Sequence, residues 1–201
     1  MIFAALLAVS CGGGTAPARN SRTGLTTGVK PVPDPEVAVI EMENAAAYGT
    51  ITIELYSNIA PKMVAQFKAL AKEGVYNGTT FHRINPEVIQ GGDPNSKDDD
   101  PNNDGSGKSN KPNVLAEFSD VPYDAGIVGA ARGQDINSAN AQFFITLKRM
   151  PGFDKNYTIF GKVVDGMNNV RTISAVTPKT GTSREMPVEP IRIKSVTIKP
   201  R

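Results

Sequence analysis

The sequence predicts a mainly β domain in which about eight short strands and two helices form a sandwich or a barrel. Three observations favour this class. Short apolar stretches recur along the chain, Gly and Pro separate them, and only two stretches have helical periodicity. A barrel would leave no strand edge exposed. With 201 residues, of which 39% are hydrophobic and 21% charged, the chain is long enough for one such domain with its own core.

The first two strands, over 37–42 and 50–55, are expected to pair as a β-hairpin, because both have partial apolar alternation and a turn-like stretch separates them. Further strands are expected over 80–84, 88–90, 126–131, 143–147, 158–163 and 191–198.

The clearest helix begins near Pro61, which suits a first helical turn, and ends at Gly74. Its apolar residues Val64, Phe67, Leu70 and Ala71 lie on one face, so this helix is expected to cover the core. A second, short helix is expected over 167–173.

Residues 1–11 look like an export signal. They form an apolar run that is too short to span a bilayer but suits the centre of a secretory signal. The end of the run, from Ala8 to Cys11, resembles a bacterial lipobox, in which the cysteine is lipidated and becomes the mature N-terminus. A buried strand or a frayed tail is the alternative.

Residues 12–36 are rich in Gly, Thr and Pro and are expected to form a flexible tether. We therefore expect a domain over 37–201 that is anchored to a membrane only through Cys11. It would lie in the cell envelope and face the periplasm or the exterior.

Charge and composition exclude several classes of function. The 22 basic and 20 acidic residues give a net charge of +2, so the chain has no strong basic field and nucleic acid is not an expected partner. One His and one Cys cannot form a thiolate or imidazole zinc cluster or an intrachain disulfide. A Cys–His dyad is discounted because Cys11 lies in the signal-like segment. No cofactor is expected.

An acidic insert over about 95–113 contains two incomplete motifs. Residues 105–109 end like a phosphate-binding loop, but Asn102 occupies the position of the leading Gly and no apolar strand precedes it. Asp100, Asn102 and Asp104 match the opening of a calcium loop, but Lys111 replaces its final Glu and no helices flank it. We expect a solvated loop and no metal, with these three residues as the only candidate ligands.

A collinear series of motifs extends from about residue 37 to residue 198. Its members are Ala60-Pro61-Lys62, Gly74-Val75-Tyr76-Asn77-Gly78-Thr79-Thr80, Phe81-His82-Arg83, Gln90-Gly91-Gly92-Asp93, Ala116-Glu117-Phe118, Gly126-Ile127-Val128, Asn137-Ser138-Ala139, Gln142-Phe143-Phe144-Ile145, Phe153-Asp154 and Ile159-Phe160-Gly161-Lys162-Val163. In order and spacing the series resembles the cyclophilins, which are peptidyl-prolyl cis-trans isomerases. The resemblance implies a closed eight-stranded antiparallel β-barrel, capped by two α-helices, with a substrate groove on its outer wall.

The chemistry of prolyl isomerisation explains why such a groove is useful. Amide resonance imposes a barrier of about 18–20 kcal/mol on rotation of the X-Pro bond. Catalysis needs no nucleophile, only an apolar pocket for the proline ring, groups that hold the flanking carbonyls, and a donor for the prolyl nitrogen. That donor bonds the nitrogen lone pair only in the twisted bond, so it stabilises the transition state selectively.

The resemblance implies a role for ten residues. Arg83 is the donor, and Gln90 steadies the arginine and the substrate backbone. The substrate-binding positions are Val88, Ala131, Arg132, Gly133, Gln142, Phe144, Phe153 and Tyr157. The alternative for Arg83 is an ordinary salt-bridging arginine, and for Phe144 and Phe153 it is plain core. His82 is expected to be structural, because neighbouring residues of a strand point to opposite faces.

Two hypotheses follow. The first is a monomeric isomerase that acts on proline-containing unfolded or loop segments while envelope proteins fold. The second is a proline-segment binding module or chaperone with little turnover. The segment 85–89 supports the second, because it is one residue shorter than usual, lacks the family's aromatic and has Val88 in place of a pocket methionine. The presence of both Arg83 and Gln90 favours the enzyme.

Overall fold

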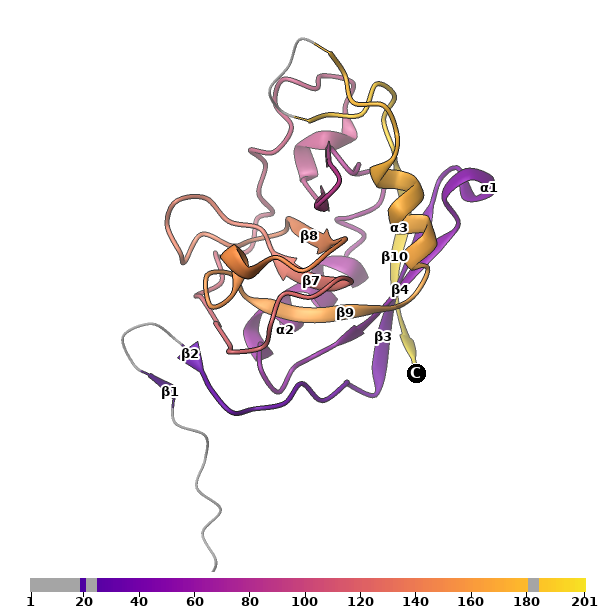
Figure 1. Ribbon diagram of the computed structural model, residues 1–201. Coiled ribbons are helices and arrows are strands. Elements are labelled where there is room, and N and C mark those ends of the chain that lie inside the picture. Colours follow the sequence, from indigo (N-terminus) through magenta and orange to yellow (C-terminus); the bar gives the residue numbers. More distant parts are fainter. Residues whose placement is uncertain (1–18, 21–24, 181–184) are drawn as a thin grey trace, which may run out of the picture.

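The computed structural model describes residues 19–20, 25–180 and 185–201, so the signal-like segment and Cys11 lie outside the described residues. Figure 1 shows how the strands and helices are arranged. The strands are β1 (Arg19–Asn20), β2 (Leu25–Thr26), β3 (Glu36–Met42), β4 (Thr50–Leu55), β5 (Arg83–Ile84), β6 (Val88–Gly91), β7 (Ile127–Ala130), β8 (Phe143–Thr146), β9 (Ile159–Asp165) and β10 (Ile193–Pro200). The helices are α1 (Ala45–Tyr48), α2 (Pro61–Lys72) and α3 (Met167–Ser174), with two 3-10 turns at Pro94–Lys97 and Pro151–Phe153.

Eight strands form one antiparallel sheet in the order β10-β3-β4-β9-β7-β8-β6-β5, and β1 pairs separately with β2. The mainly β class and the eight strands are confirmed. The prediction of a closed barrel is wrong, because the sheet is a curled half-barrel with β10 and β5 at its edges. The predicted strand over 80–84 is reduced to the two residues of β5. The segment before β5 forms an isolated bridge, Thr80 with Arg192, and single backbone hydrogen bonds to the start of β10 and the residues before it, but no continuous ladder closes the sheet.

Two helices were predicted and the described chain has three. The additional helix, α1, occupies the turn between β3 and β4. The side chain of Asn44 caps it by accepting a hydrogen bond from the backbone N–H of Ala47 at 3.2 Å. None of the helices in the described ranges has the length and apolar character needed to cross a membrane.

Side chains on the two faces of the sheet belong to two apolar clusters. Ile89, Phe143 and Phe160 belong to the core inside the sheet, where the Phe67 ring of α2 lies 5.7 Å from that of Phe143. Their chain neighbours belong to a second cluster on the outer face: Val88, Phe144 and Ile159. This alternation is the period of two that strands impose. The outer cluster forms the base of the site described below.

Residues 25–36, which we expected to be part of a flexible tether, are attached to the domain. Thr26 donates its N–H to the carbonyl of Phe118 at 2.7 Å and accepts from the N–H of Asp120 at 3.1 Å. The carboxylate of Asp34 pairs with Lys68 of α2 at 2.6 Å, and this bond and those from Ser57 outweigh burial and lower the pKa of Asp34. Part of the expected tether, from Thr26 to Asp34, therefore makes specific polar contacts with the domain.

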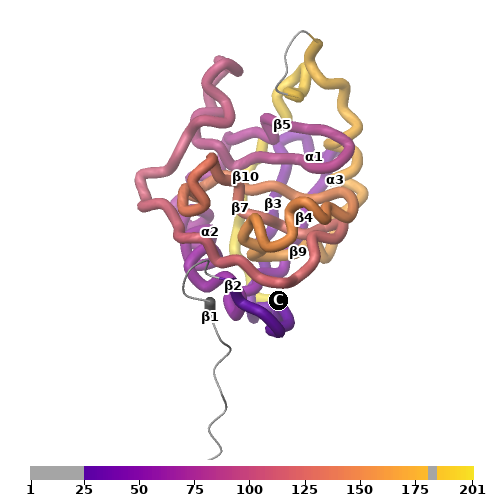
Figure 2. Tube along the Cα trace, turned by 60° about the vertical axis from the view of Figure 1, so that its left-hand side comes forward, coloured from indigo at the N-terminus to yellow at the C-terminus, as the bar shows by residue number. Residues whose placement is uncertain are grey.

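Two long connections project from the sheet at the same end (Figures 1 and 2). One is the acidic insert between β6 and β7. The other joins α3 to β10 and folds back on itself, with Lys179 donating its N–H to the carbonyl of Met186 at 2.6 Å and Val188 donating to Thr177 at 3.2 Å. We call the residues 177–180 and 185–188 of this connection the C-terminal hairpin.

Candidate active site

One row of cross-strand neighbours organises the site. Arg83 of β5 lies opposite Gln90 of β6, Gln90 lies opposite Phe144 of β8, and Phe144 lies opposite Gly129 of β7. Directly opposed residues of neighbouring strands project from the same face of a sheet. The register therefore places a cation, an amide and an aromatic ring side by side on the outer wall.

A cavity of about 120 Å³ opens on this row. It is lined by eight of the ten residues that the sequence assigned to the site: Arg83, Val88, Gln90, Ala131, Arg132, Phe144, Phe153 and Tyr157. They come from three strands, from the segment after β7 and from the loop that carries the Pro151–Phe153 turn. The structure therefore brings together residues that are up to 74 positions apart.

Aromatic rings form most of the apolar part of this cavity. The Phe144 ring packs in T-shaped arrangements with Phe153 and Tyr157, each with its centroid 5.5 Å away. Tyr123, which sequence reasoning missed, stacks on Phe144 at 5.8 Å and is fully buried. Gly129 makes this packing possible, because a Cβ there would lie 2.4 Å from Phe144 and 2.7 Å from the Tyr123 hydroxyl.

Polar contacts fix the loop that supplies Phe153 and Tyr157. Asp154 accepts a hydrogen bond from the N–H of Tyr123 at 2.9 Å and forms an ion pair with Arg149, which lowers the pKa of Asp154. The guanidinium of Arg132 lies 4.7 Å from the centroid of the Tyr157 ring and donates to the carbonyl of Asn156 at 3.0 Å. Arg132 thus connects the segment after β7 to the loop that carries Tyr157.

The remaining two predicted residues, Gly133 and Gln142, line an adjoining cavity of about 240 Å³ that shares Gln90, Ala131 and Arg132 with the first. Gln142 donates to the carbonyl of Gly107 at 3.0 Å, so part of the acidic insert forms a wall of the groove. Sequence reasoning missed this role for residues 105–108, because their composition is that of a solvated loop.

A buried carboxylate, that of Asp93, holds the insert in place. It accepts hydrogen bonds from the backbone N–H groups of Asn95, Gly105 and Gly107. A Cβ on Gly107 would lie 1.9 Å from this carboxylate, so the backbone can come this close to Asp93 only at a glycine. The sequence did single out Asp93 as the last residue of the Gln90–Asp93 motif. It did not reveal that Asp93 binds Gly105 and Gly107, because these partners lie 12 and 14 residues further along the chain.

Arg83 has a different partner from the one expected. We expected Gln90 to steady the arginine, but the Gln90 amide donates to Gln142 at 3.0 Å. The Arg83 Nε instead donates to Glu185 of the C-terminal hairpin at 2.9 Å. In the parts of the chain that the structure describes, the guanidinium has no other hydrogen bond, so its Nη1 and Nη2 groups remain available as donors.

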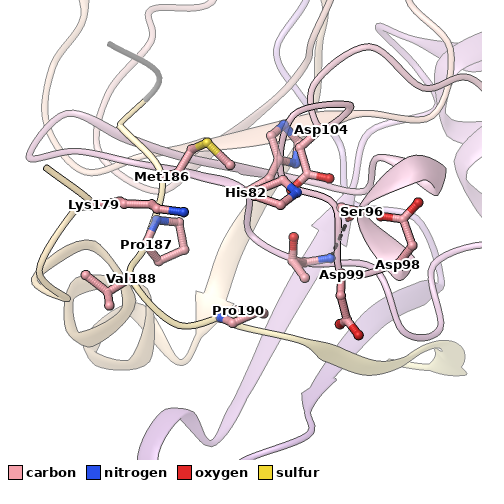
Figure 3. Close-up of a pocket in the computed structure, with 12 residues that line it drawn as sticks. His82, Ser96, Asp98, Asp99, Asp104, Lys179, Met186, Pro187, Val188 and Pro190 are labelled. Carbon is pink, nitrogen blue, oxygen red and sulfur yellow. Dashed lines mark hydrogen bonds between the residues drawn. The ribbon is translucent and has the colours of Figure 1, made fainter. Parts of the chain in front are cut away.

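His82 is buried while Arg83 is exposed, as strand alternation predicts. His82 lines a cavity of about 250 Å³ in which Met186 and Pro187 of the C-terminal hairpin face Ser96 and Asp98 (Figure 3). Burial lowers the pKa of His82, although the charge of nearby Asp93 opposes this effect. The ring is therefore neutral at physiological pH.

The three candidate metal ligands of the insert do not come together as a cage. Asp104 lines the cavity beside His82, whereas Asp100 and Asn102 do not, and the Asp100 carboxylate accepts from the side chain of Asn102 at 2.8 Å. Within residues 19–20, 25–180 and 185–201, no three His, Cys, Asp or Glu side chains are grouped so that they could hold a metal ion.

Comparisons with known proteins agree with this geometry. The family model described as "Cyclophilin type peptidyl-prolyl cis-trans isomerase/CLD" matches residues 39–198. The probable peptidyl-prolyl cis-trans isomerase of Brucella suis is 46% identical over 130 residues, which cover 62% of this chain and 66% of the relative. The match therefore spans slightly less than two thirds of that protein. Peptidyl-prolyl cis-trans isomerase ppi1 of Schizosaccharomyces pombe is 37% identical over 159 residues, covering 76% and 94% of the two chains.

A solved structure shows the same architecture. The crystal structure of a cyclophilin type peptidyl-prolyl cis-trans isomerase from Cryptosporidium parvum, determined in the presence of the dipeptide Ala-Pro, matches with a TM-score of 0.71 and 29% identity. The match covers 82% of this chain and 99% of that one. The family model covers most of the chain and its motifs meet around one groove. The chain therefore belongs to the cyclophilin-type peptidyl-prolyl cis-trans isomerases.

Proposed function

We propose that this protein catalyses the cis-trans isomerisation of X-Pro bonds in the groove formed by the two adjoining cavities. The observation that carries the proposal is the cavity of about 120 Å³, in which an arginine and a cluster of aromatic rings line the same space. The apolar side takes up the proline ring. Gln90, Gln142 and the segment 131–133 hold the flanking peptide backbone, since all of them line the adjoining cavity and Gln90, Ala131 and Arg132 line both.

Arg83 supplies the chemistry in this mechanism. In a planar amide the nitrogen lone pair is delocalised and accepts no hydrogen bond, whereas in the twisted amide it is localised. An N–H of the guanidinium then gains a partner only at the transition state, which lowers the barrier without strengthening substrate binding. Arg suits this task because it is always charged and presents several donors in a rigid plane.

Exchange NMR on an Ala-Pro peptide tests the proposal directly. We expect catalytic amounts of the protein to broaden or exchange the cis and trans resonances, which interconvert in tens to hundreds of seconds without catalysis. Binding without exchange enhancement would overturn the enzyme and leave the proline-binding module. The absence of both would reject the groove as a proline site.

We further propose that the protein acts as a monomer during the folding of other proteins in the cell envelope, anchored by a lipid on Cys11. The apolar run that ends at Cys11 supports this location. Metabolic labelling with a fatty acid, with Cys11→Ser as the control, tests it. We expect label in the wild type alone, and equal label in both proteins, or none, would contradict the location.

A further inference from the structure

The C-terminal hairpin lies against β5, the strand that carries Arg83. The backbone N–H of Ile84 donates to the carbonyl of Glu185 at 2.8 Å, so the returning half of the hairpin is bonded to the strand edge. Farther along, the N–H of Phe81 donates to Ile191 at 3.0 Å. The hairpin is thus fixed to the sheet at the point where the expected barrel fails to close.

This attachment places the Glu185 carboxylate beside the guanidinium. Its Oε2 accepts from Arg83 Nε at 2.9 Å and from Asn85 Nδ2 at 2.8 Å. Asn85 is itself held, because its side-chain oxygen accepts from the N–H groups of Glu87 and Val88 at 2.9 and 2.8 Å in the turn before β6. Glu185 therefore connects the arginine to a fixed point of the turn.

The backbone at Glu185 has an unusual conformation. Its φ of +55° lies in the left-handed region, which disfavours residues with a Cβ. This conformation coincides with three hydrogen bonds, one to the carbonyl of Glu185 and two to its carboxylate. Unfavourable backbone conformations that the surroundings maintain are often found where a side chain must be held in one place.

We propose that Glu185 is a positioning residue for the isomerase reaction, which holds the guanidinium of Arg83 over the proline cavity through Nε. This inference rests on the function proposed above. Because Glu185 occupies Nε alone, it leaves Nη1 and Nη2 for the substrate and does not compete for them. Arg83 is 44% exposed and lies on a strand of two residues, so little else limits the rotation of its side chain.

Kinetics of Glu185→Ala test the proposal. We expect kcat to fall about two- to fivefold, the size of effect typical of an exposed ion pair, with KM nearly unchanged. Glu185→Gln keeps an oxygen acceptor for Nε and Asn85, so it should recover most of the loss. In an Arg83→Lys background, which lacks Nε, Glu185→Ala should have no further effect.

A matched control and a direct readout complete the test. Glu189→Ala removes an exposed carboxylate from the same connection and should leave kcat unchanged. In NMR the Arg83 Nε–H should exchange with water more slowly in the wild type than in Glu185→Ala. Equal or higher kcat in Glu185→Ala, or equal Nε–H exchange, would overturn the role of Glu185. An inactive wild type would instead overturn the proposed function and this inference with it.

Discussion

Different forces hold the aromatic side of the groove and the side that carries Arg83. Phe144 lies on an interior strand, is only 4% exposed and packs against three other rings. Arg83 lies on the two-residue edge strand β5, and both it and its partner Glu185 are more than 40% exposed. Hydrophobic burial is insensitive to moderate salt, whereas exposed ion pairs are screened.

This contrast separates binding from turnover. The aromatic side, which we propose takes the proline, is packed like a protein core. The proposed donor, Arg83, is held by one exposed ion pair with Glu185, 102 residues away along the chain. Changes on the aromatic side should therefore affect stability and binding together, while changes around Arg83 should affect turnover alone.

Phe144→Ala should have the largest effect. Truncation of a buried Phe costs about 3–5 kcal/mol of folding free energy, and it would also remove the surface that contacts the proline ring. Urea denaturation and peptide titration by NMR measure the two effects. Phe143→Ala, one residue earlier but facing the inner core, is the matched control and should destabilise the fold with less effect on peptide affinity in the protein that remains folded. Equal loss of affinity in both variants would contradict the claim that only the outer face, with Phe144, contacts the proline.

Asp93→Ala should have the next largest effect. It leaves three backbone N–H groups without their acceptor, of which that of Gly107 is buried, and a buried donor without a partner costs about 1–3 kcal/mol. The wall formed by residues 105–108 should loosen, which thermal denaturation and hydrogen exchange of Gly107 would detect. Asp100→Ala, at an exposed position in the same insert, should change the melting temperature little. If Asp93→Ala had as small an effect as Asp100→Ala, the insert would not depend on the buried carboxylate.

The sequence predicted the aromatic side better than the arginine side, for a physical reason. The family motifs assigned Phe144, Gln90 and Arg83 to one groove, and strand alternation assigned His82 to the face opposite Arg83. The partner of Arg83 lies 102 residues away in an exposed hairpin. Exposed polar pairs leave no periodic signal. Tyr123 was missed because it lies in a loop, where burial depends on contacts that are distant in the sequence.

A smaller effect should appear in the pH dependence of stability. His82 is the only histidine of the chain, and burial lowers its pKa in the folded protein below the ordinary value of 6.5. The unfolded chain therefore binds a proton at a higher pH than the folded protein does. The free energy of unfolding should decrease as the pH falls from 6.5 towards the folded pKa of His82.

Urea denaturation at about pH 7.5 and pH 5.5, on either side of the unperturbed value, measures this decrease. His82→Gln, which cannot titrate, should lose less stability between the two conditions than the wild type. Carboxylates that do not interact with His82 contribute equally to both proteins, so the difference reports on the imidazole together with its neighbour Asp93. An identical decrease in the variant would show that His82 titrates normally in the folded protein.

The most direct test of the account is Arg83→Ala in a line-shape NMR assay that measures peptide affinity and bound-state exchange together. Loss of a charge-assisted hydrogen bond that exists only at the transition state should slow exchange about ten- to a hundredfold. The dissociation constant should change less than about threefold, because the aromatic side of the groove is intact. Near-normal exchange in Arg83→Ala, or a loss of affinity as large as the loss of exchange, would contradict the separation of donor from pocket.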